Sequence, residues 1–243
     1  MKLIKEAFDL ILPRTCSVCG GTPDADGKLP YDVPEDFHIC FNCLSSIIPQ
    51  PADKRFFLCL SEPYEGDPHP GLALYMPFAY RGFFEEAVPR AKFRSHPEIA
   101  EFMGQLLGSF MAKDGIKADL AVPVPLSHGR LKERGYNQAD LIAGQAAAAA
   151  GIPYAADVLV RTRETMRQTE ITDDAQRSLN MKGAFSCSSA YDIGGLNILL
   201  IDDVATTGNT LHEAACALFD AGAANVSCAA VCGNRAVLNA EAF

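Results

Sequence analysis

The segment Leu196–Thr210 constrains the fold of this chain more than any other part of the sequence. It contains an apolar stretch, Ile198–Ile201, that is typical of a buried strand in a parallel sheet. Two adjacent carboxylates, Asp202 and Asp203, follow this strand, and a loop of small and hydroxyl-bearing residues then leads into a helix. Open α/β sheets bind ligands at the carboxyl ends of their strands, so the segment predicts a binding site as well as a fold class.

The loop after the carboxylates has the composition of an anion-binding turn. It offers hydroxyl groups and closely spaced backbone N–H groups, and a helix that begins near Thr210 directs its partial positive charge to the same place. Ionised carboxylates only accept hydrogen bonds, which suits them to a diol. The simpler alternative is a well-capped helix, but a cap needs one acceptor rather than two acids followed by three threonines and a glycine. We therefore expect a sugar-phosphate site here.

The stretch Ile198–Leu211, Ile-Leu-Leu-Ile-Asp-Asp-Val-Ala-Thr-Thr-Gly-Asn-Thr-Leu, resembles the phosphoribosyl-pyrophosphate (PRPP) signature of type I phosphoribosyltransferases. That resemblance implies that Asp202 and Asp203 hold the ribose 2′ and 3′ hydroxyls. It also implies a cradle for the 5-phosphate, made of Ala205, Thr206, Thr207, Gly208, Asn209 and Thr210. The 6-oxopurine salvage enzymes carry an aspartate for the purine ring where this loop has Thr206, so hypoxanthine or guanine is a less expected acceptor.

Composition limits the class of protein. The chain has 243 residues, 49% of them hydrophobic, which suits one large domain or a medium domain with a small one. No apolar run approaches the roughly 18 residues of a membrane span, and the N-terminus is expected to form an amphipathic helix rather than a signal peptide. We therefore expect a cytoplasmic protein that does not bind a membrane. The net charge of −9 argues against general nucleic-acid binding.

Basic residues are nevertheless clustered, which points to a local anionic ligand, although solvated surface faces would account for part of the pattern. The clusters are Arg90, Lys92 and Arg94; Arg130, Lys132 and Arg134; and Arg161, Arg163 and Arg167.

Four of the nine cysteines have the spacing of a structural zinc site. Cys16, Cys19, Cys40 and Cys43 form the pattern C-x2-C-x20-C-x2-C, and four thiolates complete a tetrahedral zinc with no open position. The intervening residues are poor in apolar side chains, so metal binding worth about 10–16 kcal/mol would hold the segment together. A redox pair would be expected once rather than twice, and His38 could replace one ligand. The other cysteines are expected in the core: Cys59, Cys187, Cys216, Cys228 and Cys232.

The pattern along the chain predicts a small N-terminal unit followed by an α/β domain. We expect an N-terminal helix and zinc ribbon in residues 1–49, a linker in residues 50–71, and a phosphoribosyltransferase-like domain in residues 72–243, with a parallel-type sheet flanked by helices. Strands are expected at Leu72–Tyr80, Asp119–Leu126, around Val158, at Ile198–Ile201 and at Val226–Val231. Helical character is expected at Gly82–Lys92, Glu98–Met111, Asn137–Ala150 and Leu211–Ala221.

A second basic loop is expected to complete the site. Residues Pro123–Gln138 leave a strand, pass through Arg130, Lys132 and Arg134, and enter a helix. Arginine offers bidentate contacts to phosphate, so this loop would face the pyrophosphate of PRPP. A solvated surface loop is the alternative.

Several segments together look like the ComF/GntX family, which comprises competence-protein-F-like proteins with a phosphoribosyltransferase domain. They are Pro-Val-Pro-Leu at 123–126, Arg-Gly-Tyr-Asn-Gln at 134–138, Arg161-Thr-Arg with Gln168, Arg177–Phe185, and the N-terminal zinc ribbon. The resemblance covers essentially the whole chain. It implies that Lys92 also contacts pyrophosphate, that residues 161–182 form a mobile hood over the site, and that the protein is connected to DNA uptake.

Two functions follow as alternatives. The first is a phosphoribosyltransferase, in which Mg²⁺ offsets the pyrophosphate charge and basic side chains stabilise the leaving group while an unknown, nitrogenous acceptor attacks the ribose. No residue has the features of a general base. The second is a non-catalytic protein that senses PRPP, with the zinc ribbon docking a helicase or single-stranded DNA. The acidic residues around the ribbon favour a protein contact over DNA.

Overall fold

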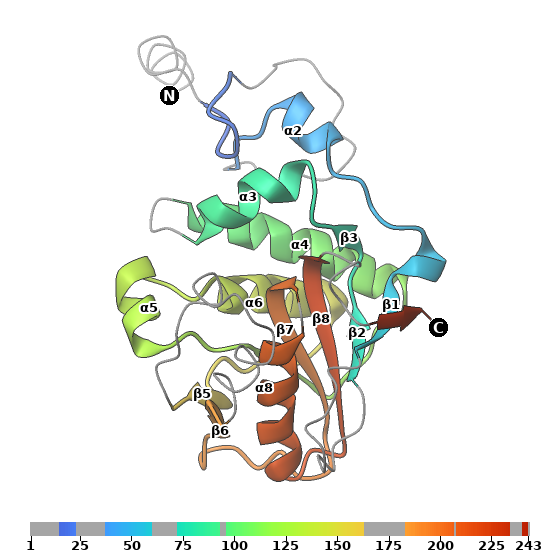
Figure 1. Cartoon of the computed structure of the whole chain (residues 1–243), viewed down its shortest axis with the longest axis vertical. Coiled ribbons are helices and arrows are strands. Elements are labelled where there is room, and N and C mark those ends of the chain that lie inside the picture. Colours follow the sequence, from blue (N-terminus) through green and yellow to red (C-terminus); the bar gives the residue numbers. More distant parts are fainter. Residues whose placement is uncertain are drawn as a thin grey trace.

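A computed structural model shows the chain as an α/β fold with a small cysteine-bearing unit above it (Figure 1). The structure describes residues 15–22, 37–59, 72–92, 96–162, 183–206, 208–233 and 240–242. The expected N-terminal helix, nearly all of the expected hood and Thr207 therefore lie outside the described residues. Within the described ranges, no helix has both the length and the apolar character that crossing a bilayer requires.

The main sheet is parallel over the strands that carry the predicted site. Its order is β4-β7-β8-β2-β1-β9, with β3 beside β8. These strands are β4 (Leu120–Pro123), β7 (Asn197–Ala205), β8 (Asn225–Gly233), β2 (Leu72–Tyr75), β1 (Phe56–Cys59), β9 (Ala240–Ala242) and β3 (Phe78–Ala79). Neighbours from β4 to β2 run parallel, whereas β1 is antiparallel to both β2 and β9. The predicted α/β class with a parallel-type sheet is confirmed.

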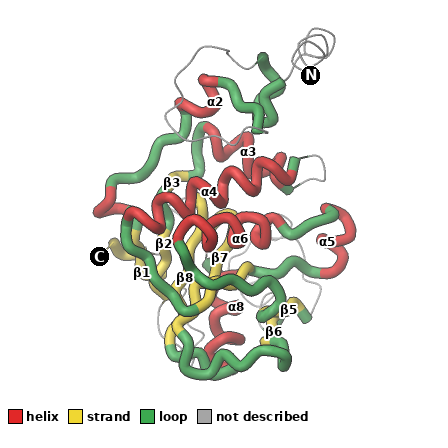
Figure 2. Tube along the Cα trace, turned by 180° about the vertical axis from the view of Figure 1, so that it is seen from behind, coloured by secondary structure: helices red, strands yellow, loops and turns green. Residues whose placement is uncertain are grey.

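Helices cover both faces of this sheet. α3 (Phe83–Ala91), α4 (Pro97–Lys113) and α6 (Gln138–Ala150) lie on one side, and α8 (Asn209–Asp220) lies on the other (Figures 1 and 2). The alternation of β7 explains the two layers, since Leu199 and Ile201 pack in one core with α4 and α6 while Ile198 and Leu200 pack in a second core with α8. β7 is buried on both faces, as its continuous apolar run predicted.

Most expected elements are present, but four segments differ from the sequence-based predictions. The strand expected at residues 72–80 is divided into β2 and β3. The basic loop after β4 is a short helix, α5 (His128–Arg134). The strand near Val158, β5 (Leu159–Arg161), pairs with β6 (Phe185–Cys187) in a separate two-stranded sheet. The segment expected as a linker contains a turn of 3-10 helix (Ala52–Lys54) and β1, which joins the main sheet.

The former linker segment is held to the domain by a buried ion pair. Arg55 donates to both carboxylate oxygens of Asp114, at the end of α4, over 2.9 and 2.7 Å, and Tyr75 donates to the same carboxylate at 2.8 Å. The Arg55 guanidinium also lies 4.7 Å from the centre of the Phe110 ring. Residues 50–59 are therefore part of the packed structure.

The cysteine-bearing unit also packs directly on the domain. It contains the helix α2 (Phe41–Ser45), and its residues Val18, Phe37 and Leu44 belong to the same core as α3 and α4. The Phe37 ring stacks on Phe102 with centroids 4.6 Å apart. Since this contact is apolar and buried, the unit and the helical layer form one continuous core.

Candidate functional site

The predicted site lies where β7 meets the N-terminus of α8. β7 extends to Ala205, so Asp202 and Asp203 lie inside the strand rather than after it, as the sequence had suggested. The longer strand follows from pairing, because β8 continues alongside β7 as far as Ala205 and Gly233. Gly233 is required there, since a Cβ at that position would lie 2.3 Å from the Ala205 carbonyl oxygen. Pairing of β7 with β8 therefore fixes the backbone that carries the two carboxylates.

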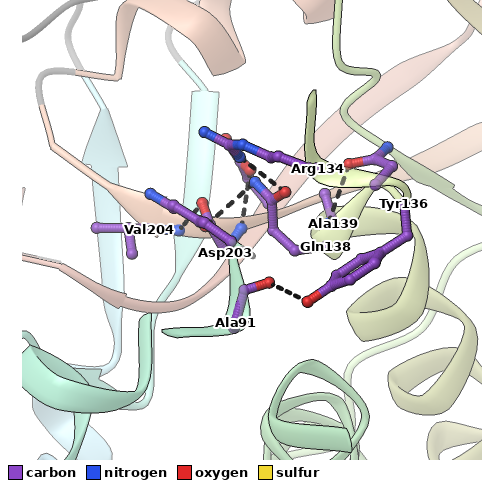
Figure 3. A network of polar contacts seen from close by, with 10 residues as sticks. Ala91, Arg134, Tyr136, Gln138, Ala139, Asp203 and Val204 are labelled. Carbon is purple, nitrogen blue, oxygen red and sulfur yellow. Dashed lines mark hydrogen bonds and ion pairs between the residues drawn. The ribbon is translucent and has the colours of Figure 1, made fainter. Parts of the chain in front are cut away.

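Asp203 is the centre of a buried polar network. Its side chain is 8% exposed, and its Oδ2 lies 3.3 Å from Nζ of Lys92. The same oxygen accepts a hydrogen bond from Nε2 of Gln138 at 3.4 Å, and Oδ1 accepts from the backbone N–H of Val204 at 2.8 Å. Gln138 in turn accepts from Arg134 at 2.9 Å (Figure 3). The network thus joins α3, α5, α6 and β7.

Asp202 has a different environment. Its Oδ1 accepts the backbone N–H of Asp203 at 2.8 Å, and its side chain is only partly buried. Burial and the neighbouring Asp203 carboxylate raise the pKa of Asp202 above its usual range. A hydroxyl-bearing or cationic ligand would favour the ionised form of this pair, because two adjacent carboxylates repel each other.

The described residues of the expected phosphate loop lead from the end of β7 into α8. Gly208 has φ +80°, in the left-handed region, and precedes α8, whose first turn is closed by His212 N–H donating to Gly208 O at 2.8 Å. Ala205 is buried at the end of β7 and Thr206 is exposed. Asn209 and Thr210 open the helix, so its N-terminal backbone N–H groups follow the two carboxylates within a few residues of the chain. Thr207 lies outside the described residues.

The expected basic residues are placed differently from one another. Lys92 is the C-cap of α3 and pairs with Asp203, while Arg134 ends α5 and reaches the network through Gln138. Arg130 and Lys132 lie earlier on α5, and Lys132 is exposed. The basic groups of the second loop are thus presented by a helix.

The sequence analysis assigned no role at this site to three residues. Gln138 appeared there only within the 134–138 segment that resembles the family, yet it is 4% exposed. Tyr136 donates to the Ala91 carbonyl at 2.8 Å, directly before Lys92 (Figure 3). Cys232 pairs with Val204 across β7 and β8, and burial together with Asp203 raises its thiol pKa well above the ordinary value. No periodicity marks these residues, because their roles depend on contacts between distant segments.

The four predicted metal ligands are gathered in one cluster. The sulfur atoms of Cys16, Cys19, Cys40 and Cys43 all lie within 4.8 Å of one another. Sγ of Cys19 and Sγ of Cys40 are 3.7 Å apart, which matches the roughly 3.8 Å edge of a tetrahedron with zinc–sulfur bonds of about 2.3 Å. Backbone N–H groups of Gly21 and Cys43 donate to Cys19 and Cys40 sulfurs at 3.4 Å.

The charges in this cluster also fit a cation. Burial raises the pKa of the Cys16 thiol, but hydrogen bonds from Cys19, Cys40 and Val18 outweigh it and lower the pKa to about 7. Burial and the neighbouring thiols raise the pKa of Cys43. Four sulfurs this close cannot all ionise without a bound cation, so the residues fit a metal such as zinc.

Comparison with known proteins agrees with the fold. Residues 137–241 match the phosphoribosyl transferase domain family, which is less than half of the chain. That range contains β7, α8 and the paired carboxylates. The matched range is therefore similar to the class of phosphoribosyltransferase domains.

Within that class, the chain is a homologue of competence and DNA utilization proteins. It is 40% identical to competence protein F of Haemophilus influenzae over 38% of this chain and 40% of that protein. It is 34% identical to DNA utilization protein YhgH of Salmonella typhimurium over 60% of this chain and 65% of that protein. It is also 34% identical to competence protein ComFC of Bacillus subtilis over 62% of this chain and 60% of that protein. The resemblance to the competence protein F family is confirmed, although each match spans less than two thirds of the relative.

Solved structures with a similar arrangement include a glutamine PRPP amidotransferase from B. subtilis in complex with ADP and GMP. The likeness covers 57% of this chain and 29% of that one, at 22% sequence identity and a TM-score of 0.39. At that score the likeness is too partial to assign a property to this chain.

Proposed function

We propose that this chain binds PRPP at the end of β7 and transfers its phosphoribosyl group to a nitrogenous acceptor, with release of pyrophosphate. In this proposal Asp202 and Asp203 hold the ribose hydroxyls, and the turn from Ala205 to Thr210 binds the 5-phosphate. Lys92, Arg130, Lys132 and Arg134 bind the pyrophosphate. The observation that carries the proposal is the contact between Lys92 and Asp203 near the end of β7, the strand that precedes α8 in the chain.

The geometry supports this assignment in chemical terms. Oδ1 of Asp203 receives one hydrogen bond in the described part of the chain, from Val204, and a carboxylate oxygen can accept two. One acceptor position is therefore left for a hydroxyl, and Asp202 adds a second, more exposed carboxylate. The glycine turn and helix N-terminus suit a phosphate, since backbone N–H groups and the helix dipole both favour an anion.

Cations complete the proposal. Mg²⁺ bound with PRPP would offset the pyrophosphate charge, because this hard cation prefers oxygen ligands. The four clustered cysteines would hold one structural zinc, which leaves no coordination position for catalysis. A cytoplasmic location, where PRPP would be available, is part of the same proposal.

Calorimetric titration with Mg-PRPP tests the site. The Asp202→Ala/Asp203→Ala variant is expected to bind at least about tenfold more weakly than the wild type, a loss of about 1.4 kcal/mol. Asp192→Ala is a matched control, because Asp192 lies in an exposed turn before the opposite end of β7 and accepts from Gly194. Unchanged affinity in the double variant would refute the site assignment.

A second candidate is a non-catalytic PRPP-sensing protein of DNA uptake. The names of the curated relatives, competence protein and DNA utilization protein, favour it. In this second candidate the cysteine cluster binds single-stranded DNA or a helicase. The Lys92–Asp203 pair would change when PRPP binds and would thereby signal that PRPP is present.

Two measurements separate the candidates. Pyrophosphate release from PRPP, screened across nitrogenous bases, is expected for the enzyme and absent for the sensor. If the cysteine cluster binds single-stranded DNA, the electrophoretic shift of that DNA is expected to disappear when the metal is removed. A shift that survives chelation places the DNA contact elsewhere.

A further inference from the structure

Residues 134–138 connect three separate parts of the proposed site. Arg134 donates to Oε1 of Gln138, and Nε2 of Gln138 donates to Asp203. Tyr136 donates to the carbonyl of Ala91, the residue before Lys92. This short segment therefore contains one residue proposed to bind pyrophosphate, and it contacts Asp203, which is proposed to bind the ribose, and the end of α3 next to Lys92 (Figure 3).

The orientation of the Gln138 amide is determined by its two partners. A glutamine amide has an oxygen that only accepts and a nitrogen that only donates. The oxygen faces the Arg134 guanidinium, which has no acceptor, so the nitrogen must face Asp203, whose carboxylate has no donor when ionised. Gln138 is 4% exposed, so water cannot easily replace either partner.

The backbone of this segment is itself held in place. Asn137 is the N-cap of α6, where its side-chain oxygen accepts from Ala139 N–H at 3.2 Å. Its amide nitrogen donates to the Val124 carbonyl just beyond β4, at 3.0 Å. The backbone at Gln138 is therefore fixed. A movement of the amide oxygen next to Arg134 must then also move the amide nitrogen next to Asp203.

We infer that Gln138 is a positioning residue that couples the pyrophosphate half of the site, through Arg134, to the ribose half, through Asp203. The inference rests on the proposed function. A guanidinium has five N–H donors, so Arg134 can contact phosphate oxygens while it keeps its bond to Gln138. Binding of the anion then holds the Gln138 amide with its N–H group toward Asp203, and PRPP binds more tightly than its two parts would separately.

A double-mutant cycle measures this coupling. Mg-PRPP and Mg-pyrophosphate are titrated into the wild type, Gln138→Leu, Arg134→Met and the double variant. Gln138→Leu is expected to weaken PRPP binding about tenfold, since the connection between Arg134 and Asp203 is lost, but to change pyrophosphate binding little. The double variant is expected to be no weaker for PRPP than Arg134→Met alone.

The control is Gln145→Leu. Gln145 lies on the same helix and accepts a hydrogen bond from Gln105, outside the network around Asp203. This variant is expected to bind PRPP like the wild type. If Gln138→Leu behaves like this control, or if the effects of Gln138→Leu and Arg134→Met simply multiply, the inference is wrong while the proposed function stands. A wild type that binds no PRPP overturns both.

Gln138→Glu supplies a readout that a purely structural role would not change. It keeps the size of the side chain and an acceptor for Arg134, but it replaces the N–H donor to Asp203 with a second carboxylate. Protonation of one carboxyl restores a donor, so PRPP affinity relative to the wild type is expected to rise as pH falls from about 8 toward 5. A ratio that stays constant over this range contradicts the inference.

Discussion

The two adjacent carboxylates of β7 differ in what surrounds them. Among the described residues, Asp203 has a cation and two N–H donors within hydrogen-bonding range, whereas Asp202 has one backbone N–H and a neighbouring negative charge. Lys92 pairs directly with Asp203, whereas for Asp202 burial and the Asp203 charge outweigh the favourable effect of Lys92. This difference makes Asp202 the residue whose ionisation should respond most directly to a ligand.

Asp202 should make the protein less stable as pH rises. Its pKa is raised in the folded state by burial and by Asp203, so the folded protein holds a proton that the unfolded chain has already released. Stability therefore falls as pH rises from about 4 into the neutral range. Asp202→Asn is expected to remove this dependence and to add on the order of 1 kcal/mol at neutral pH, measured by urea unfolding across that range.

Asp119→Asn provides the opposite control. Hydrogen bonds from the backbone and side chain of Asn197 lower the pKa of Asp119. The Asp119 carboxylate stabilises the folded protein at neutral pH, and this contribution is lost as pH falls through the lowered pKa. The free energy of unfolding of Asp119→Asn should therefore lie below that of the wild type at neutral pH and approach it in acid. Parallel profiles for the wild type and Asp202→Asn would contradict the account of Asp202.

At the scale of elements, the close approach of α4 to α6 fixes the position of α6, the helix that begins at Gln138. A Cβ on Gly104 would lie 2.5 Å from the Ile142 carbonyl oxygen, and one on Gly108 would lie 2.6 Å from that of Ala146. Only glycine allows two helix backbones to come this close. Since α6 begins at Gln138, this contact fixes the helix whose first residue reaches Asp203.

Gly104→Ala is therefore expected to destabilise the protein although alanine favours helices. The clash with α6 should cost about 1–3 kcal/mol after the helix-propensity gain of about 1 kcal/mol is included. Gly144→Ala is the control, because the nearest atom to its Cβ would be Tyr154 at 3.9 Å, and it should stabilise by up to about 1 kcal/mol. Chemical denaturation measures both. Equal stability of the two variants would show that the helices can separate without cost.

At the scale of the whole molecule, the cysteine-bearing unit and the sheet domain are one packed body in the described residues. Phe37 stacks on Phe102 of α4, and Arg90 of α3 donates to the Ser17 carbonyl at 3.3 Å. α3 also carries Lys92 at its end. The cysteine cluster is therefore connected to the proposed site through one helix, α3.

Removing the proposed zinc should lower the melting temperature and weaken PRPP binding. Chelation is expected to lower the melting temperature, because the unit has little apolar core of its own apart from what it shares with α3 and α4. Elemental analysis should find one zinc per chain in the untreated protein. Cys187→Ser, in β6 and outside the cluster, should retain both metal and melting temperature. A chelated protein that melts like the untreated one would contradict this link.

Local sequence was sufficient for much of the fold. The continuous apolar run of β7, the asparagine cap and glycine end of α6, and the two C-x2-C pairs each specify their structure through neighbours in the chain. The strand and helix on either side of the predicted site could be predicted from sequence too, because strand, turn and helix signals follow one another directly in the chain.

Other features were decided by contacts between distant segments. Residues 56–59 form a strand because β2 and β9 offer partners, and β7 continues through its two aspartates because β8 runs beside it. The pairing of Lys92 with Asp203, and the placement of Gln138 between Asp203 and Arg134, join residues far apart in the chain. The sequence alone determined which groups are available for a sugar-phosphate site and a metal site. Only the tertiary structure decided which of those groups meet, since burial and hydrogen-bond partners depend on the packing of separate helices and strands.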